Sequence, residues 1–463
     1  MTQSSSSYLL EVVTQPHMDT MTILSGRSLN GAITVPGDKS ISHRVLILGA
    51  LARGISRATG FLPSDDCIST MHCLMALGVR IDRPNETTAH VHGVGLRGFI
   101  EPDDVLGCGN SGTTMRLLSG ILAAQDFYAV LTGDASLRRR PMARIAEPLR
   151  RMGATVMGRH GGAYPPLTIH GGRLHAMEYA MPVASAQVKS CILLAGLYAD
   201  GASQVTEPFP SRDHTERMLQ VQGVRVLTSA HVQSATVTSP SGAVTITVDP
   251  PREPLLPLDV DIPGDISSAA FFLVAASIVP RSHLVIRGVG INSTRAGILD
   301  VLAAMGAQVG QENSRLAGGE PVADLVAQSA ALRGTEICGA LVPRLIDELP
   351  VIAVAATQAH GTTTVHDASE LRVKESDRIT ALVTELRKLG AQIEELPDGF
   401  EVHGPSPLHG SVVDAHGDHR LAMSLAVAGL VAHGETTILG TDSIPVSFPG
   451  FQGTLATCMG ENR

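Results

Sequence analysis

Basic side chains in the first half of the chain stand at the start of apolar runs, where they are suited to binding anions. Lys39, Ser40 and Arg44 lead into the run 45–51. Ser40 and Arg44 are four residues apart and share one face of a helix. Lys39 lies beside the free N–H groups of the helix start, which favour anions. A capped helix with solvated charges accounts for this segment equally well, so the segment alone leaves both interpretations open.

Segment 107–116 is a Gly-rich loop that leads into an apolar run. Gly107, Gly109 and Gly112 let backbone N–H groups approach an anion closely. The Gly-Lys-Ser/Thr ending of a P-loop is absent. On this loop alone an ordinary capped helix is the better interpretation.

Three further segments of the first half place polar side chains before apolar runs. The basic run 138–140 follows a turn and ends at a proline, an arrangement that lets one of its arginines point into a cleft. Segments 185–187 and 211–215 each open a helix, and each alone is only a cap.

The second half combines cations with carboxylates. Lys374 and Arg378 are four residues apart, and Glu375 is three residues before Arg378. On an exposed helix such ion pairs contribute only a few tenths of a kcal/mol. Two more charged segments, 346–348 and 416–420, directly precede apolar runs. Charges placed repeatedly at the start of buried helices indicate a polar cleft.

The elements that must position these side chains repeat along the chain. Five segments consist of a Leu, three residues and a Gly followed by a strand-like run, and a weaker sixth copy lies at the C-terminus. The glycines are Gly78, Gly153, Gly223, Gly306, Gly390 and Gly460. Their regular spacing indicates a repeat, and a left-handed Gly ends a helix. We therefore expect six units, each with a helix, a tight stop and a strand, and three units in each half.

Two Pro-Gly-Asp segments, 36–38 and 263–265, mark equivalent points of the two halves. Each follows a strand-like stretch and precedes an apolar run. The first is followed by Lys39 and the second by Ile266. Since a helix start needs no lysine, this difference favours a chemical role for Lys39.

The repeats and a Pro-rich linker at 250–257 predict the domain organisation. We expect a disordered N-terminal extension over 1–21. The first three-repeat domain is predicted over 38–258, and the second over 22–37 plus 259–463. Helices alternate with strands, which predicts the α/β or α+β class.

Composition excludes several classes of function. A net charge of −9 disfavours nonspecific nucleic-acid binding, so an anionic ligand needs a local cluster of cations. The six cysteines form no CxxC pair, which favours reduced thiols in the cytoplasm. His416 and His419 lack an obvious third ligand, so no metal site is expected. No run is apolar enough to span a bilayer, and the N-terminus lacks a signal sequence.

Seven segments occur in an order that resembles the 5-enolpyruvylshikimate-3-phosphate synthase family, the enolpyruvyl transferases of the shikimate pathway. They are PGDKSISHR (36–44), GNSGTTMRL (109–117), GDASLRRRPM (133–142), ASAQVKS (184–190), SRDHTERML (211–219), LRVKESDRI (371–379) and DHRLAMS (418–424). A single segment is weak, but seven in order are highly specific. The resemblance covers nearly all of the chain from about residue 22, and the fourth and fifth segments are similar to the bacterial class II form.

The resemblance implies a fold and an activity. The fold is a two-domain inside-out α/β barrel, α/β or α+β in class, built from six βαβαββ repeats with the active site between the domains. The enzyme transfers the carboxyvinyl group of phosphoenolpyruvate to the 5-hydroxyl of shikimate 3-phosphate and releases phosphate, with no metal or organic cofactor. Its partners are these two small molecules, without nucleic acid or membrane, and a cytoplasmic monomer is expected.

The resemblance also implies which residues bind the two substrates. Phosphoenolpyruvate would be held by Lys39, Gly112, Arg140, Gln187, Arg378 and Arg420. Shikimate 3-phosphate would be held by Lys39, Ser40, Arg44, Ser185, Ala186, Gln187, Arg212, Asp347 and Lys374. Both substrates are multiply anionic, so fixed cations must offset their repulsion. The expected catalytic groups are Asp347 and Lys39 at the 5-hydroxyl and Glu375 at the methylene carbon of phosphoenolpyruvate.

Three positions depart from patterns within that family. Ser447 stands where class I forms carry a Lys, so one phosphate contact is expected to be absent or supplied by another residue. Ala186 stands where class I forms have a second Ser. Gly112 stands where some class II forms carry Ala, which narrows the pocket against the herbicide glyphosate, and with Gly here we predict that glyphosate enters.

Two alternatives belong to other classes of function. The sister enolpyruvyl transferase that acts on UDP-N-acetylglucosamine shares the repeated fold but has an essential loop cysteine; Cys108 is the only candidate, and its surroundings do not match. A non-catalytic binding module would have no use for Asp347 and Glu375 facing its anionic ligands, because the carboxylates repel them.

Overall fold

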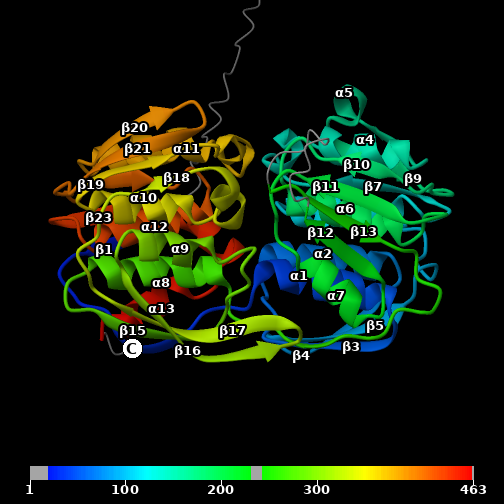
Figure 1. The fold of residues 1–463 in the computed structure, drawn as a ribbon, viewed down its shortest axis with the longest axis horizontal. Coiled ribbons are helices and arrows are strands. Elements are labelled where there is room, and N and C mark those ends of the chain that lie inside the picture. The colour runs from blue at the N-terminus through cyan, green and yellow to red at the C-terminus, as the bar shows by residue number, and fades with distance from the viewer. Residues whose placement is uncertain (1–18, 231–241, 461–463) are drawn as a thin grey trace, which may run out of the picture.

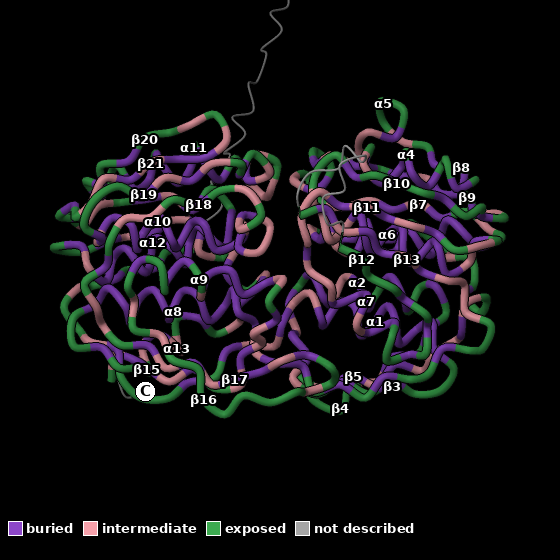
Figure 2. The backbone as a smooth tube through the Cα atoms, in the orientation of Figure 1, coloured by how far each residue is buried: buried purple, intermediate pink, exposed green. Residues whose placement is uncertain are grey.

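The computed structural model describes residues 19–230 and 242–460, which form two lobes lying side by side (Figure 1). Each lobe has its own hydrophobic core. The first-lobe core consists of residues between Ile41 and Ile262. The second-lobe core combines residues between Met21 and Val35 with residues between Ile266 and Cys458. The central helices of both lobes are buried (Figure 2).

Six central helices carry most of the two cores. In the first lobe they are α1 (Lys39–Leu51), α3 (Gly112–Leu122) and α6 (Ala186–Gly196); in the second they are α8 (Ile266–Ile278), α10 (Leu349–Thr357) and α12 (His419–Gly429). All 13 residues of α8 are buried. A helix that is apolar or small on every side is stable only inside a core, so these helices lie beneath the sheets.

Six further helices end at the glycines of the repeat. They are α2 (Asp65–Ala76), α4 (Ala143–Arg151), α7 (His214–Val221), α9 (Gly297–Ala304), α11 (Arg378–Lys388) and α13 (Phe451–Cys458). The repeat glycine follows each one after a single capping residue, with φ between 73° and 112° in the six copies. The predicted helix stops are therefore confirmed. The remaining short elements are α5 (Arg159–Gly162), η1 (Leu137–Arg139), η2 (Gly339–Arg344), η3 (Ser369–Val373) and η4 (Thr441–Val446).

The strands form three sheets in each lobe. In hydrogen-bonded order, the first lobe has β14 (Asp259–Asp261), β3 (Arg53–Thr59), β5 (Thr88–Val94) and β4 (Arg80–Asn85); β6 (Leu106–Gly107), β7 (Tyr128–Thr132), β9 (Tyr164–His170) and β8 (Thr155–Gly158); and β10 (Glu178–Ala180), β11 (Ser203–Glu207), β13 (Val244–Val248) and β12 (Val226–Ala230). The second lobe has β2 (Asn30–Thr34), β15 (His283–Gly290), β17 (Glu320–Gln328) and β16 (Gln308–Ala317); β18 (Glu336–Ile337), β19 (Gly361–Val365), β21 (Gly399–Gly404) and β20 (Gln392–Leu396); and β22 (Val412–Asp414), β23 (Glu435–Leu439) and β1 (Thr20–Leu24).

The pairing follows the order of a βαβαββ unit. In each sheet the first two strands named are parallel and the other neighbours are antiparallel. The predicted six-unit α/β architecture is confirmed. The sixth unit has only three strands among the described residues, and β1 from the start of the chain supplies one of them.

The two lobes exchange one strand each where the chain crosses between them. β2 precedes α1 of the first lobe but pairs with β15 of the second. β14 precedes α8 of the second lobe but pairs with β3 of the first. The two Pro-Gly-Asp segments therefore run side by side at the crossing, and Gly37 and Gly264 form a bridge.

This crossing is tied by hydrogen bonds and a buried arginine. Asp38 N donates to Pro263 O at 2.8 Å, and Asp265 N donates to Pro36 O at 2.8 Å. Arg295, 3% exposed, lies 3.0 Å from Asp38 Oδ2 and 2.7 Å from Asp265 Oδ1. A Cβ at Gly37 would lie 1.8 Å from Gly60 O, so this close approach requires glycine.

Two predicted boundaries differ from the strand pairing. Residues 1–18 of the predicted extension lie outside the described residues, but Thr20 and Met21 belong to β1, because Met21 packs in the second-lobe core. The predicted boundary at 258 assigns β14 to the second domain, whereas β14 extends a first-lobe sheet. Pairing between distant segments leaves no local signal in the sequence. The division into two domains as such stays a prediction.

Candidate active site between the lobes

A cavity of about 420 Å³ lies between the lobes, and all the predicted site residues line it. They are Lys39, Ser40, Arg44, Gly112, Arg140, Ser185, Ala186, Gln187, Arg212, Asp347, Lys374, Glu375, Arg378 and Arg420. The amino ends of α1, α3, α6 and α12 open into the cavity, and Asp347 lies just before α10. The fold thus turns the first turns of its central helices toward one place.

The cavity is strongly positive for an acidic chain. Ten Lys and Arg side chains line it against five Asp and Glu side chains. The whole chain has a formal net charge of −9. A cleft with surplus fixed cations favours multiply anionic ligands.

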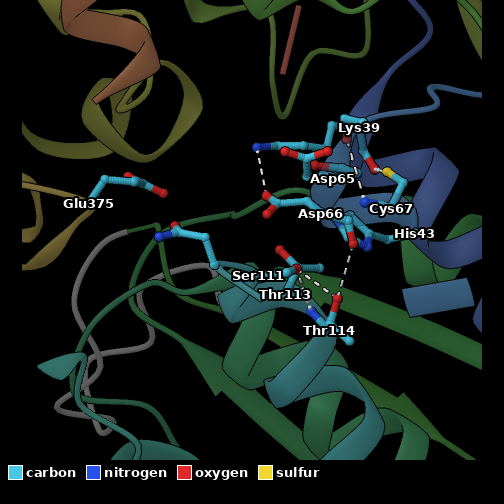
Figure 3. Close-up of polar contacts among 12 residues, drawn as sticks. Lys39, His43, Asp65, Asp66, Cys67, Ser111, Thr113, Thr114 and Glu375 are labelled. Atoms are coloured by element: carbon cyan, nitrogen blue, oxygen red, sulfur yellow. Dashed lines mark hydrogen bonds and ion pairs between the residues drawn. The ribbon is translucent and has the colours of Figure 1, made fainter. Parts of the chain in front are cut away.

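Lys39 faces the cavity from the first turn of α1. Its Nζ lies 3.1 Å from Asp66 Oδ2, an ion pair visible in Figure 3. Figure 3 also shows Glu375 on the opposite side of the group, on a segment of the second lobe. The sequence analysis did not identify Asp66, because an acidic residue in the first turn of α2 looks like an ordinary helix-dipole partner.

Arg44 is buried and held by uncharged groups. It donates to Thr215 Oγ1 at 2.7 Å, Ser190 Oγ at 2.9 Å and the carbonyl of Ser40 at 3.0 Å. Burial lowers the pKa of Arg44 to about 10. The guanidinium is therefore fixed in direction by neighbours that do not cancel its charge.

Below Lys39, four polar side chains form a buried chain. His43 Nδ1 lies 2.7 Å from Thr70 Oγ1, Thr70 Oγ1 lies 2.6 Å from Thr114 Oγ1, and Thr114 Oγ1 donates to Ser111 Oγ at 2.7 Å (Figure 3). Ser111 caps α3, since its side chain accepts from Thr114 N at 3.0 Å. These hydrogen bonds connect α1, α2 and the Gly-rich loop beneath the cavity.

Gly112 is packed between two guanidinium groups. A Cβ at this position would lie 2.6 Å from Arg116 Nη1 and 3.6 Å from Arg140 Nη1. Arg116 also contacts Gln187 Oε1 through Nη1, and burial followed by the charges of Arg144 and Arg140 holds its pKa well below the usual range. Arg116 lies in the predicted loop segment, but an arginine on an apolar helix gave no reason to single it out.

Of the three arginines in the run 138–140, only Arg140 is buried, as expected for a side chain that enters the cleft. Arg140 Nη1 lies 3.4 Å from Glu375 Oε1 of the other lobe. Two more pairs cross the cavity, Arg144 with Glu370 at 3.0 Å and Arg212 with Asp347. These three contacts bring the lobes together over the site.

Asp347 is the focus of the cationic cluster. Lys374 Nζ lies 3.6 Å, Arg378 Nη1 3.2 Å and Arg420 Nε 3.8 Å from Asp347 Oδ1. Burial by itself raises the pKa of Asp347, but Lys374, Arg420 and Arg212 together hold it well below its usual range. The carboxylate is therefore ionised.

Glu375 and Arg378 form the second charged group. Arg378 is 1% exposed; its Nε lies 2.7 Å from Asp418 Oδ2 and its Nη2 2.5 Å from Glu375 Oε2. Burial opposes ionisation of Glu375, yet Arg378 and Arg140 hold its pKa well below the usual range. Glu375 is therefore a carboxylate in this arrangement.

Of the other residues considered from the sequence, Cys108, His416 and Ser447 lie outside the cavity, and only His419 lines it. Cys108 is buried, does not line the cavity, and has a pKa raised by its hydrogen bond with Cys73 and by burial. Ser447 is 7% exposed and does not line the cavity either. His416 bonds Glu385 at 2.9 Å, whereas His419 lines the cavity.

The described part of the chain holds neither a metal-binding cluster nor a membrane-spanning helix. Over residues 19–230 and 242–460, no group of three or more His, Cys, Asp and Glu is placed to hold a metal ion. In the same residues no helix is both long enough and apolar enough to cross a membrane.

Comparison with known proteins gives a consistent result. The family model described as EPSP synthase (3-phosphoshikimate 1-carboxyvinyltransferase) matches residues 23–455. A 3-phosphoshikimate 1-carboxyvinyltransferase of Desulforudis audaxviator is 54% identical over 436 residues, covering 94% of this chain and 98% of the relative. One of Geobacter sulfurreducens is 54% identical over 429 residues, covering 93% and 96%.

Solved structures agree in fold. An EPSP synthase from Acinetobacter baumannii has a TM-score of 0.81 and 44% identity, covering 95% of this chain and 98% of that one. The enolpyruvyl transferase NikO from Streptomyces tendae has a TM-score of 0.75 and 19% identity, covering 96% and 98%, a likeness that shows the fold alone.

Proposed function

The chain belongs to the EPSP synthase (3-phosphoshikimate 1-carboxyvinyltransferase) family, and we propose that it transfers the carboxyvinyl group of phosphoenolpyruvate to the 5-hydroxyl of shikimate 3-phosphate. Phosphate is the second product, and the reaction belongs to aromatic amino acid biosynthesis. The observation that carries the proposal is the single cavity in which cations of both lobes surround Asp347 and Glu375.

We assign the two substrates to neighbouring parts of this cavity. Phosphoenolpyruvate is held by Lys39, Gly112, Arg140, Gln187, Arg378 and Arg420. Shikimate 3-phosphate is held by Lys39, Ser40, Arg44, Ser185, Ala186, Gln187, Arg212, Asp347 and Lys374. The surplus of cations supports this assignment, because two anions in one closed cleft repel each other strongly. Arginine matches the geometry of carboxylate and phosphate groups.

The reaction we assign is an addition followed by an elimination. Asp347, assisted by Lys39, takes the proton of the 5-hydroxyl of shikimate 3-phosphate. The hydroxyl oxygen bonds at the same time to C2 of phosphoenolpyruvate. Glu375 delivers a proton to the methylene carbon, which becomes a methyl group. Phosphate then leaves C2 while the Glu375 carboxylate takes a proton back from that methyl group, which restores the double bond. An acid–base group of this kind contributes about 10²- to 10⁴-fold.

The protonation states support these roles in different ways. Asp347 is ionised, as a base must be. Glu375 is also ionised, because Arg378 and Arg140 stabilise its charge. Bound anions compete for those two arginines, so we expect substrate binding to raise the pKa of Glu375 and to make it a proton donor.

We further propose a cytoplasmic monomer. The cations that face the cavity from both lobes belong to the same chain, so the proposed site needs no residue of a second copy. All six cysteines are unpaired thiols, which supports a reducing compartment. The UDP-N-acetylglucosamine enolpyruvyl transferase alternative is not favoured, since Cys108 does not reach the cavity.

A phosphate-release assay with both substrates tests the proposal. The parent enzyme should release phosphate only when phosphoenolpyruvate and shikimate 3-phosphate are both present. Lys39→Ala and Glu375→Ala should each lose about 10²- to 10⁴-fold in kcat. Arg225→Ala, which removes an exposed ion pair of the first lobe, is the control. A parent that releases phosphate with UDP-N-acetylglucosamine and not with shikimate 3-phosphate would overturn the assignment.

A further inference from the structure

Arg212 lies in a first-lobe segment whose two flanks are fixed by different lobes. On one side, Ser211 donates to Glu207 through its N–H at 2.9 Å and its hydroxyl at 2.6 Å. Lys189 Nζ donates to the carbonyl of Ser211 at 3.1 Å. All of these groups belong to the first lobe, so they fix only the residue before Arg212.

The residue after Arg212 is held by the second lobe. Asn292 Nδ2 donates to Asp213 Oδ1 at 2.7 Å, and Thr294 Oγ1 donates to the same oxygen at 3.2 Å. Asp213 occupies the N-cap position of α7, but its side chain makes no capping bond to that helix. Aspartate is a preferred capping residue, but here Oδ2 pairs with Arg217 Nε of α7 at 2.8 Å and Oδ1 accepts both bonds from the second lobe.

A hairpin turn of the second lobe completes the contact. β16 and β17 are joined at Gly318 and Gly319, with φ of 56° and 84°, and Glu320 follows the turn. Figure 1 shows the two strands reaching below the gap between the lobes toward the first lobe. A Cβ at Gly319 would lie 3.7 Å from Val221 at the end of α7. The turn is therefore seated against the helix that follows Arg212.

Glu320 joins the hairpin to the same segment through buried groups. Its Oε1 lies 2.8 Å from His214 Nδ1, and its Oε2 accepts from Asn292 Nδ2 at 2.9 Å. His214, Glu320 and Asn292 are 1%, 2% and 3% exposed. Solvent does not screen these buried bonds, so losing one of them should change the position of the segment that carries Arg212.

We propose that Asn292, Thr294 and Glu320 are positioning residues that set the place of Arg212 in the shikimate 3-phosphate subsite. Arg212 reaches Asp347 of the second lobe and lies 3.4 Å from Ser40 Oγ. The second lobe thus holds the side chains of Asp213 and His214, which follow Arg212 in the chain, and it contacts the guanidinium of Arg212 through Asp347. This inference rests on the proposed function.

Asn292→Ala tests the inference, with the KM of each substrate as the readout. The variant should raise the KM for shikimate 3-phosphate about tenfold, the change equivalent to one hydrogen bond to a charged group. The KM for phosphoenolpyruvate should change less than about twofold, because its assigned ligands lie outside this contact. In an Arg212→Lys background, Asn292→Ala should have a smaller effect, since both changes act on the same group.

Two further variants keep the test decisive. Asn30→Ala, which removes an exposed hydrogen bond to Ser28, is the matched control and should leave both KM values unchanged. If Asn292→Ala does not fold, Thr294→Val removes one bond to Asp213 at nearly constant volume and should raise the same KM about threefold.

Equal rises in both KM values, or full additivity with Arg212→Lys, would overturn the inference. An unchanged KM for shikimate 3-phosphate in a folded Asn292→Ala or Thr294→Val would do the same. A parent enzyme without activity on the two substrates would instead contradict the proposed function.

Discussion

Lys39 Nζ and Asp66 Oδ2 lie 3.1 Å apart at the mouth of the cavity, and Asp66 Oδ1 is buried without a hydrogen-bond partner. The carboxylate therefore gives Lys39 one oxygen and leaves the other uncompensated. This arrangement orients the lysine while holding its charge toward the cavity.

Asp66→Asn should lower kcat/KM about 10- to 100-fold in the phosphate-release assay. The amide keeps the shape of the side chain but removes the charge that fixes Lys39. Asp65→Asn is the matched control, because Asp65 lies next to Asp66 in the first turn of α2 but is exposed. Equal losses in the two variants would show that the helix start, and not the ion pair, matters.

Gly112→Ala should raise the KM for phosphoenolpyruvate about tenfold. The added Cβ would lie 2.6 Å from Arg116 Nη1, so the guanidinium must move and its contact with Gln187 weakens. Gly107→Ala is the control, since a Cβ there meets nothing within 4 Å.

The parent enzyme, which has Gly at position 112, should be inhibited by glyphosate in competition with phosphoenolpyruvate. Absence of inhibition at millimolar glyphosate would contradict the prediction that glyphosate enters the pocket.

Asp418→Asn should destabilise the protein by about 3–5 kcal/mol in urea unfolding, because it leaves the buried guanidinium of Arg378 without its main partner. Asp300→Asn removes a similar ion pair, with Arg344 at 2.6 Å, but Asp300 is 56% exposed. That control should cost less than about 1 kcal/mol. Similar losses in both variants would argue against burial as the cause.

The stability of the protein should fall as the pH decreases below about 6.5, with a contribution from His419. Burial first, and then the charge of Lys39, lower the pKa of His419 to about 3. The unfolded chain binds the proton near pH 6.5, so between these values it holds more protons than the folded state. The free energy of unfolding then falls by about 1.4 kcal/mol for each pH unit lost.

His419→Gln should flatten this dependence when urea unfolding is measured at about pH 7, 6 and 5. His175→Gln, at an exposed position, should leave the slope as it is in the parent. An unchanged slope in His419→Gln would mean that this histidine has the same pKa in the folded and the unfolded state.

The local elements of the fold were predictable because their signals are local. The five Leu-to-Gly segments and the weaker sixth copy predicted where helices stop, and each of the six glycines has the positive φ that the pattern requires. The Pro-Gly-Asp segments were predicted to be equivalent, but not to touch. Their contact depends on the exchange of β2 and β14, which no neighbouring residue encodes.

The candidate site was predictable in its charged residues and not in their partners. The fourteen residues named from the sequence line one cavity, whereas Asp66, His43 and Arg116 were missed. Asp66 and Arg116 take part in helices that explain them without any chemistry. Their importance comes from the residues that they contact, and these contacts between distant segments cannot be inferred from the local sequence.

β1 and β2, the first strands to be synthesised, pair with strands that lie much later in the chain. β1 pairs with residues 435–439 and β2 with residues 283–287, so neither strand has a neighbour until most of the chain has been synthesised. The first-lobe sheet that contains β3, β4 and β5 is likewise incomplete until β14, at 259–261, has been synthesised. Contacts so distant in sequence slow folding, and nascent chains of this protein should therefore depend on cellular holding factors during translation more than their individual helices would suggest.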